Sequence, residues 1–251
     1  MTAATTTSIG MIIPFDSALD REFWQYVPDG VDLFLTRTPH VAGPLGVPLM
    51  AAVSEPASIL SAAADMAVAL DPDVVVYACT SGSFIRGLDA CRQLRADIEA
   101  AGCRRGGSTS EFVLDALELL GAGRVAVAAP YDDEMTGLLL DFLREAGHDP
   151  VSFANLGMTG DPKTVDSQRV LGLARAADSA TAEALILSCT NLRTFELVPM
   201  LESELGKPVL TSNQVSVWGA LVHAGAPMPE IDHALFKREP PQPSLPPTRG
   251  A

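Results

Sequence analysis

Short apolar runs rich in Val and Ile alternate along this chain with longer stretches rich in Ala and Leu. Several of the short runs are apolar almost throughout, which is typical of strands buried on both faces of a parallel sheet. The longer stretches have the length of helices, and glycines follow four of them, as is common where helices end. The alternation predicts an α/β fold with doubly wound parallel sheets. The predicted strands are residues 8–13, 31–36, 73–78, 124–129, 151–156, 183–188 and 208–211, and the predicted helices are residues 55–70, 86–101, 111–121, 133–146, 163–177 and 194–205.

One pattern occurs twice. Residues 74–84 read "VVVYACTSGSF" and residues 184–195 read "ALILSCTNLRTF", so an apolar run ends in Cys-Thr and a polar turn in both. The two cysteines, Cys79 and Cys189, lie 110 residues apart.

Two further echoes follow the same order. "IGMIIPFDS" (9–17) matches "VAVAAPYDD" (125–133), and "GSTSEFVLDAL" (107–117) matches "LTSNQVSVWGAL" (210–221), which pairs Thr109 with Asn213. Three echoes at similar offsets predict two similar flavodoxin-like halves related by a pseudo-twofold axis, with the site between them. We expect the first half at residues 8–115 plus about 212–235, the second at 116–211, and a Pro-rich extended tail at 239–251.

The echoed polar residues follow predicted strands, and parallel sheets bind ligands beyond the carboxyl ends of their strands. Two halves that face each other would bring Cys79 and Cys189 to opposite sides of one small ligand. One thiol can then remove a proton from one face of a carbon while the other supplies a proton to the opposite face. Backbone N–H groups at a helix start should favour the thiolate and lower the thiol pKa from about 8.5.

Small polar side chains around the two cysteines are candidate donors to a carboxylate or an enediolate. Several have a plain structural alternative: Asp16, Ser17, Thr109 and Asn213 could cap helices, Tyr131 could be a core aromatic, and Asp161 could belong to a turn. Cys91 and Cys103 are interpreted as buried small apolar residues. The candidate substrate-binding residues are Asp16, Ser17, Thr80, Ser81, Thr109, Tyr131, Asp161, Thr190, Asn191 and Asn213.

The composition limits the classes of molecule that the protein is expected to bind. The 251 residues carry a net charge of −14, which argues against nucleic acid and anionic membranes. No apolar stretch approaches the roughly 18 residues that span a bilayer, and the N-terminal segment lacks the features of a signal peptide. We therefore expect a cytoplasmic protein with reduced cysteines. No Cys-x-x-Cys motif or clustered histidine predicts a metal, and no Gly-rich phosphate loop predicts a nucleotide cofactor.

The paired Cys-Thr motifs, "IIPFDS", "APYDDEM" and "TSNQVSVWGAL" resemble the aspartate/glutamate racemase superfamily over about residues 8–225. The likeness is to the branch of maleate cis-trans isomerases, arylmalonate decarboxylases and racemase-like proteins of ectoine utilisation. This resemblance implies two α/β halves, no cofactor, a small carboxylate substrate and a homo-oligomer, either dimer or tetramer. It also implies that Cys79 is a nucleophile, that Cys189 handles a proton, and that Tyr131 binds a substrate carboxylate.

The sequence also departs from parts of this branch. The decarboxylases are similar around "CTSGSF", where Thr80 and Ser81 would donate to a carboxylate, but they carry only the second cysteine. The maleate isomerases have Asn near the positions of Ser17 and Asp161. We therefore expect a cofactor-independent isomerase or racemase of a small carboxylic acid, of the maleate isomerase kind. The two missing Asn residues argue against maleate itself, and the sequence does not identify the substrate. Two alternatives stay open: an arylmalonate-type decarboxylase, or a non-catalytic ligand-binding or thiol-sensing protein.

Overall fold

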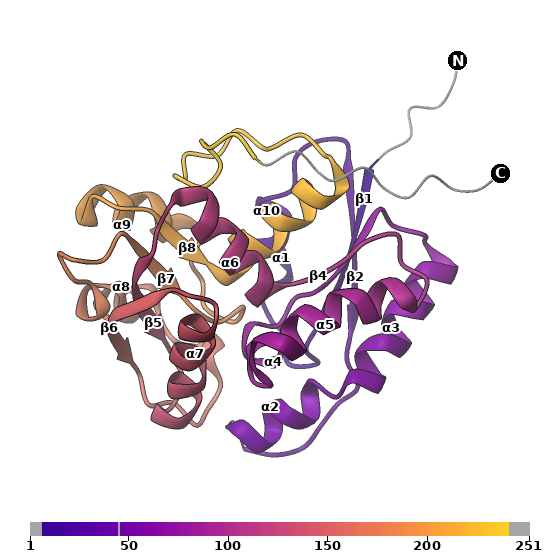
Figure 1. Ribbon diagram of the computed structural model, residues 1–251, viewed down its shortest axis with the longest axis horizontal. Coiled ribbons are helices and arrows are strands. Elements are labelled where there is room, and N and C mark those ends of the chain that lie inside the picture. The colour runs from indigo at the N-terminus through magenta and orange to yellow at the C-terminus, as the bar shows by residue number, and fades with distance from the viewer. Residues whose placement is uncertain (1–6, 45, 241–251) are drawn as a thin grey trace.

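The computed structural model describes residues 7–44 and 46–240. Its strands are β1 (Thr7–Ile13), β2 (Val31–Arg37), β3 (Val74–Tyr77), β4 (Gly106–Ser108), β5 (Arg124–Ala129), β6 (Asp149–Asn155), β7 (Ala184–Leu187) and β8 (Val209–Thr211). They form two four-stranded parallel sheets in the orders β2-β1-β3-β4 and β6-β5-β7-β8 (Figure 1). The second order repeats the first, strand for strand, which confirms the α/β fold of two similar sheets.

Helices follow most of the strands. They are α1 (Asp20–Gln25), α2 (Val47–Val53), α3 (Pro56–Ala69), α4 (Thr80–Phe84), α5 (Gly87–Ala100), α6 (Thr109–Leu120), α7 (Asp133–Glu145), α8 (Ser167–Ala177), α9 (Val198–Leu205) and α10 (Ser212–Ala224). Two 3₁₀ helices, η1 (Pro162–Thr164) and η2 (Phe195–Leu197), precede α8 and α9. The single helices expected at 163–177 and 194–205 are therefore each divided in two.

Each division has a local cause. Asp166 caps α8 by accepting a hydrogen bond from the backbone N–H of Arg169, so the helix starts there rather than at residue 163. Pro199 stands in the first turn of α9, where its missing N–H costs nothing. Strand β4 has no strand signal in the sequence, because Gly106 and Gly107 contribute no apolar side chain.

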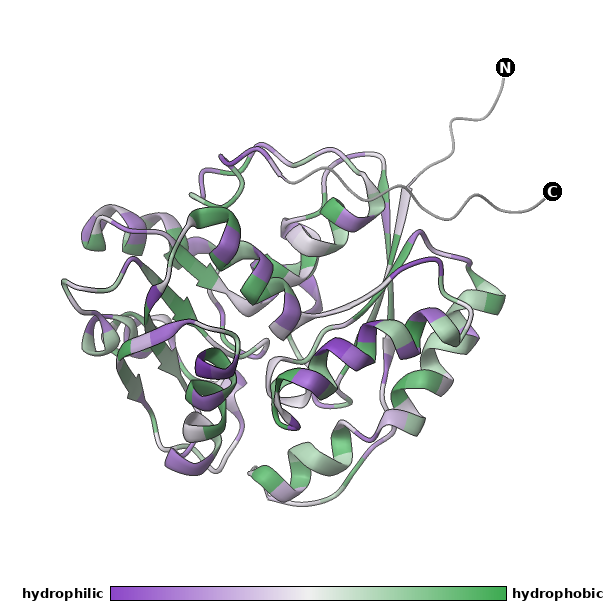
Figure 2. Ribbon diagram, viewed as in Figure 1, coloured by the Kyte–Doolittle hydropathy of each residue, from purple (hydrophilic) through white to green (hydrophobic). Residues whose placement is uncertain are grey.

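The apolar core has three parts. The outer face of the first sheet packs against α3 and α5, and the outer face of the second sheet packs against α8 and α9. The third and largest cluster joins the inner faces of both sheets through α6, α7 and α10. Figure 2 shows the inner strands of the second sheet, β5 and β7, as largely hydrophobic, as expected of strands covered on both sides.

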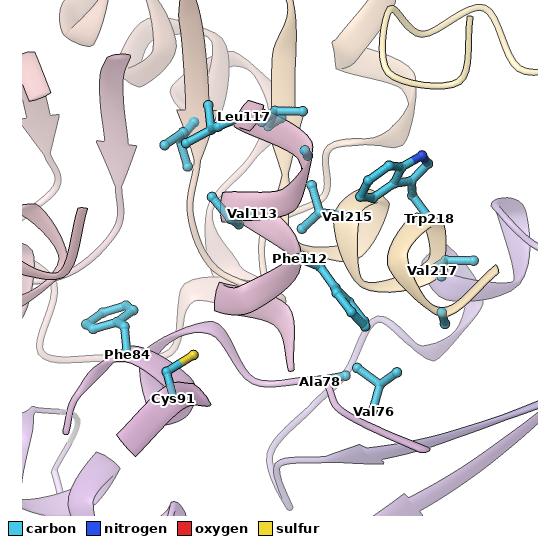
Figure 3. Close-up of a cluster of buried hydrophobic side chains, with 14 of the residues drawn as sticks. Val76, Ala78, Phe84, Cys91, Phe112, Val113, Leu117, Val215, Val217 and Trp218 are labelled. Atoms are coloured by element: carbon cyan, nitrogen blue, oxygen red, sulfur yellow. The ribbon is translucent and has the colours of Figure 1, made fainter. Parts of the chain in front are cut away.

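The contact between α6 and α10 is close. Phe112 on α6 is fully buried and lies near Val215 and Trp218 of α10 and Ala78 at the end of β3 (Figure 3). A Cβ atom on Gly219 would lie 2.2 Å from Cγ of Phe112, so only glycine fits at this position. Helix α10 also packs on β1 and β3, and thus reaches back from the second sheet to the first.

The proposed domain division, 8–115 plus about 212–235 and 116–211, stays a prediction. In the predicted tail at 239–251, residues 241–251 lie outside the described part of the chain.

One expectation about apolar stretches was wrong. The stretch Val47–Ala69 is long and apolar enough, by length and composition alone, to span a membrane, with a mean hydropathy of 1.3. In the structure this stretch is two helices, because α2 ends at Val53 and α3 begins at Pro56. Ile59, Ala63 and Met66 of α3 pack on the first sheet.

Polar side chains join the two halves. The carboxylate of Glu22 on α1 is buried and accepts hydrogen bonds from the backbone N–H of Thr194, at 3.1 and 3.2 Å, and from the Thr194 hydroxyl at 2.6 Å. Burial raises the pKa of Glu22, and the bonds from Thr194 and Asn213 oppose that rise. This carboxylate is therefore a buried link between α1 and the segment after β7.

Replacing this link should destabilise the protein. Glu22→Ala leaves the N–H and hydroxyl of Thr194 without their partner, and we expect it to lower the free energy of unfolding by about 1–3 kcal/mol. Urea denaturation measures the change, with the exposed Glu196→Ala as the control. Equal stabilities of the two variants would show that the link contributes nothing.

Candidate active site

Cys79 stands between β3 and α4. It caps the short helix: its Sγ accepts a hydrogen bond from the backbone N–H of Gly82 at 3.4 Å, and the hydroxyl of Ser81 lies 3.9 Å from the same sulfur. The side chain is 4% exposed. The first sulfur therefore lies at the carboxyl end of the first sheet, as the sequence predicts.

Tyr77, two residues earlier on β3, lies on the other side of this sulfur. A Cβ atom on Gly82 would be 2.4 Å from the Tyr77 hydroxyl oxygen and 3.0 Å from Cys79 Sγ, so both atoms crowd the same point. The glycine of "CTSGSF" thus leaves the space in which the hydroxyl and the sulfur face each other. Tyr77 was not among the candidate residues, although it stands inside the motif "VVVYACTSGSF".

Cys189 stands at the equivalent position, after β7. Its Sγ accepts a hydrogen bond from the backbone N–H of Asn191 at 3.4 Å. Its φ is +120°, which side-chain-bearing residues rarely adopt and which costs of order 1–3 kcal/mol. Cys79, by contrast, has an extended backbone with φ −141°.

Ser212, the first residue of α10, holds the two cysteine segments together. Its hydroxyl oxygen accepts a hydrogen bond from the backbone N–H of Cys189 at 2.9 Å and another from the Thr80 hydroxyl at 2.7 Å. The repeated sequence pattern pairs Thr109 with Asn213, but Thr109 and Ser212 are the residues that open α6 and α10. Aligning the first residues of these two helices would have identified Ser212 as the counterpart of Thr109.

Tyr131, after β5, lies beside both cysteines. It is 5% exposed, and its hydroxyl shares a hydrogen bond with the Ser188 hydroxyl at 3.1 Å. Burial raises its pKa well above 10, and the charge of Cys189 and, to a lesser extent, that of Cys79 add to the rise. Its hydroxyl therefore stays protonated and is a hydrogen-bond donor at all ordinary pH values.

The expected lowering of the thiol pKa is wrong. Burial raises the pKa of Cys79, and the Gly82 N–H and the Tyr77 and Ser81 hydroxyls offset only part of the rise. Burial also raises the pKa of Cys189, to about 12, although the hydrogen bond from the Asn191 N–H acts to lower it. Loss of solvation outweighs the helix start because one N–H at 3.4 Å replaces few of the hydrogen bonds that water gives a thiolate.

The candidate hydroxyls and amides divide into two groups. Four side chains are already engaged: Thr80 with Ser212, Thr109 with Ser216 at 2.7 Å, Asn191 with the backbone of Asp16 and Ala18, and Asn213 with the Thr190 carbonyl. Three are available for a ligand among the described residues. The Ser17 hydroxyl is buried without a partner, the Thr190 hydroxyl has none, and the Ser81 hydroxyl contacts two sulfur atoms, that of Met50 at 3.1 Å and that of Cys79 at 3.9 Å.

Two acidic residues lie at the edge of this group. Partial burial is the main cause that raises the pKa of Asp16, and the nearby charge of Asp161 raises it further. Asp161 caps η1 and forms an ion pair with Lys163. Asp161 therefore has the turn role that the sequence left open, close enough to influence Asp16.

A small apolar pocket adjoins the candidate site. Ser81 and Tyr131 form one part of its wall, and three methionines form most of the rest; the lining residues are Gly46, Met50, Ser81, Tyr131, Asp132, Met135 and Met158. No Lys or Arg lines it. In the described part of the chain, no cluster of three or more His, Cys, Asp or Glu side chains is placed to hold a metal ion.

A family profile described as arylmalonate decarboxylase matches residues 44–234. The chain belongs to the arylmalonate decarboxylase family. It is 32% identical to the arylmalonate decarboxylase of Bordetella bronchiseptica over 233 residues, which cover 90% of this chain and 93% of that protein. The branch named from the sequence motifs is thereby confirmed.

Other members of the family group are more distant. The maleate isomerase of Geobacillus stearothermophilus is 23% identical over 157 residues, 59% of this chain and 62% of that enzyme. Among solved structures, a liganded arylmalonate decarboxylase variant with one Gly replaced by Cys and one Cys by Ser superposes with a TM-score of 0.84. That pair is 29% identical and covers 92% of this chain and 99% of the other.

The crowding at Gly82 gives a test of the site in this family member. Gly82→Ala should displace the Tyr77 hydroxyl or the Cys79 sulfur, and so change the alkylation rate of Cys79 by at least about tenfold, measured by peptide mass spectrometry. Gly137→Ala is the control, because Gly137 lies in α7 with nothing within 4 Å and should gain about 0.5–1 kcal/mol of stability. Unchanged Cys79 reactivity in Gly82→Ala would contradict the close contact.

Proposed function

We propose that this protein is a cofactor-independent enzyme that decarboxylates a small malonate bearing an apolar substituent. The observation that carries the proposal is the match to an arylmalonate decarboxylase along nine-tenths of both chains. The polar groups around Cys189 supply the donors that such a reaction needs. The methionine-lined pocket beside them has a volume of only about 10 Å³, so the flexible methionine side chains must move to admit a substituent, and they suit an apolar group rather than a second charged one.

Binding of the substrate uses the available donors. The hydroxyls of Ser17, Ser81 and Thr190 would donate to the two carboxylates, which gives the buried Ser17 hydroxyl the partner it lacks. Thr80, Thr109, Asn191 and Asn213 instead hold the segments in place through their hydrogen bonds. The substituent enters the apolar pocket.

The chemical step breaks one carbon–carbon bond. The bond to the departing carboxylate breaks, CO₂ leaves, and the electron pair passes through the α-carbon into the remaining carboxylate, giving an enediolate. Tyr131 and Thr190 stabilise its oxygens by hydrogen bonds. The Cys189 thiol then protonates the α-carbon, and the resulting thiolate recovers its proton from water.

The protonation state of Cys189 suits a donor. Its pKa of about 12 keeps the thiol protonated through neutral and mildly alkaline pH. A thiolate there would be unable to deliver the proton. Burial, which opposes the usual nucleophilic role of cysteine, therefore favours the role of acid.

A second candidate reaction is favoured by Cys79, which the decarboxylase role leaves without a task. A thiolate there could take the α-proton of a bound acid while Cys189 donates to the opposite face, which is racemisation. Alternatively the Cys79 thiolate could add to one alkene carbon of a cis diacid while Cys189 protonates the other. The molecule would then rotate about the new single bond. Loss of the Cys79 thiolate from one carbon and of a proton from the other would give the trans diacid.

The decisive experiment measures CO₂ release and product chirality with a series of 2-aryl- and 2-alkylmalonates in D₂O. We expect one deuterium at the α-carbon of the product. Cys189→Ala should lower kcat by at least about 10³-fold, because it removes the group that protonates the α-carbon. Cys103→Ala, a buried cysteine outside the site, is the control and should keep full activity. No CO₂ from any of these malonates would refute the decarboxylase proposal.

Cys79→Ala separates the two reactions. A decarboxylase should keep its rate in this variant, whereas racemisation of the product acid or maleate-to-fumarate conversion should be lost, because each needs both thiols. Polarimetry and proton NMR of each substrate measure the outcomes. Loss of CO₂ release in Cys79→Ala would instead place Cys79 in the decarboxylation.

The pH dependence follows from Cys189. Because its pKa is raised to about 12, the donor form is present below that value and is lost only as the pH approaches it. We expect kcat for decarboxylation to stay level between pH 7 and about 10. A decline in kcat with a midpoint near pH 8 would show that the donor has an ordinary thiol pKa.

A further inference from the structure

The two thiols have unequal neighbours. In the first half, Tyr77 is two residues before Cys79; in the second half, the equivalent strand position two residues before Cys189 is Leu187. Each sulfur accepts one backbone N–H at 3.4 Å, although the backbone differs, with φ +120° at Cys189 and −141° at Cys79. The side chains differ as well, because Tyr77 has no tyrosine counterpart at the same strand position of the second half.

The Tyr77 hydroxyl is buried and lacks a conventional hydrogen-bond partner among the described residues. The side chain is 0% exposed, and its hydroxyl has no hydrogen-bond partner of good geometry among the described residues. Burying such a hydroxyl destabilises the fold unless it finds a hydrogen-bond acceptor. The Cys79 sulfur is its neighbour: both atoms lie within 3.0 Å of the point that a Cβ on Gly82 would occupy, and a hydrogen bond from the Tyr77 hydroxyl acts to lower the pKa of the Cys79 thiol.

The other tyrosine near the thiols is less available. The Tyr131 hydroxyl already shares a hydrogen bond with Ser188 at 3.1 Å, so its donation to Cys189 competes with that bond. Tyr77 has no such competitor. A thiolate at Cys79 would thus accept from the Gly82 N–H and from an uncommitted hydroxyl, with Ser81 at 3.9 Å as a third neighbour.

We propose that Tyr77 is a positioning residue whose hydroxyl donates to the Cys79 sulfur, so that Cys79 is the thiol that accepts a proton from the substrate and Cys189 is the thiol that delivers one. The assignment of direction rests on the proposed function, in which an α-carbon is deprotonated and reprotonated. In that cycle the α-proton passes to the Cys79 thiolate, the electron pair enters the carboxylate, and the Cys189 proton goes to the opposite face. Tyr77 keeps its own proton throughout.

Other titratable groups face the same space. Asp16, Cys189 and Tyr131 lie near Cys79, and a charged Asp16 disfavours the thiolate. Burial raises the pKa of Tyr77 well above 10, and the charge of Cys79 adds to that rise. The hydroxyl therefore stays a donor over the whole range in which a thiol titrates.

The first test needs no substrate. Thiolate absorbance near 240 nm is followed against pH in the full chain and in Tyr77→Phe. Tyr26→Phe is the control, because Tyr26 is a buried tyrosine with no part in the proposed chemistry. Burial raises the pKa of Cys91 to about 12 and that of Cys103 to about 11, and all three tyrosines ionise well above 10. The step that is absent in Cys79→Ser is thereby assigned to Cys79.

We expect Tyr77→Phe to raise the midpoint of the Cys79 step by about one pH unit, and Tyr26→Phe to leave it unchanged. Equal midpoints in Tyr77→Phe and the unaltered protein would overturn the proposal. Should Tyr77→Phe fail to fold, Gly82→Ala, which pushes the hydroxyl and the sulfur apart, must raise the same midpoint. An unchanged midpoint in that variant would overturn the proposal equally.

The second test concerns direction. Exchange of the α-proton of a product acid into D₂O should slow by about tenfold in kcat in Tyr77→Phe, with KM unchanged, and its pH profile should move with the Cys79 midpoint. CO₂ release, which needs only Cys189, should keep its rate. An exchange rate that is unaltered while the midpoint moves would overturn the assignment of Cys79 as proton acceptor. If no acid is turned over at all, the proposed function fails, while the titration still decides the role of Tyr77.

Discussion

The hydrogen bonds that meet at the Ser212 hydroxyl set the positions of both cysteines. The oxygen accepts from the Thr80 hydroxyl, next to Cys79, and from the backbone N–H of Cys189. A shift of α10 relative to β3 would therefore move one sulfur with respect to the other. The close packing of Phe112 against Gly219 prevents such a shift, since there is no spare space between α6 and α10. The geometry of the thiols thus depends on helix packing some distance away.

Much of the fold could be predicted because its signals are local. The Val- and Ile-rich runs matched seven strands, and the three echoes in the sequence were enough to indicate two similar sheets. Strand β4 was missed because Gly106 and Gly107 carry no apolar signal. These glycines form a strand because they pair with Val75 and Val76 of β3. Helix α4 was missed for a related reason: "TSGSF" has the composition of a turn, and it becomes helical where Cys79 caps it after β3.

The candidate site was only partly predictable. The two cysteines and Tyr131 could be found because they stand at strand ends in repeated contexts. Whether Thr109 or Asn213 faces a ligand or a neighbouring helix depends on side-chain partners that sequence letters do not contain; here both join helices and loops. The thiol pKa was predicted in the wrong direction because desolvation depends on tertiary burial, whereas a helix start can be inferred locally.

The difference between Tyr77 and Leu187 has a meaning for how duplicated folds acquire function. In a symmetric dimer of a single half, any substitution appears at both strand ends, so the two thiols must stay chemically identical. Joining the halves in one chain removes that constraint, since each copy can change alone. Equivalent backbone positions can then carry unlike chemistry, and a reaction that distinguishes the two sides of a molecule becomes accessible to a scaffold whose architecture is nearly symmetric.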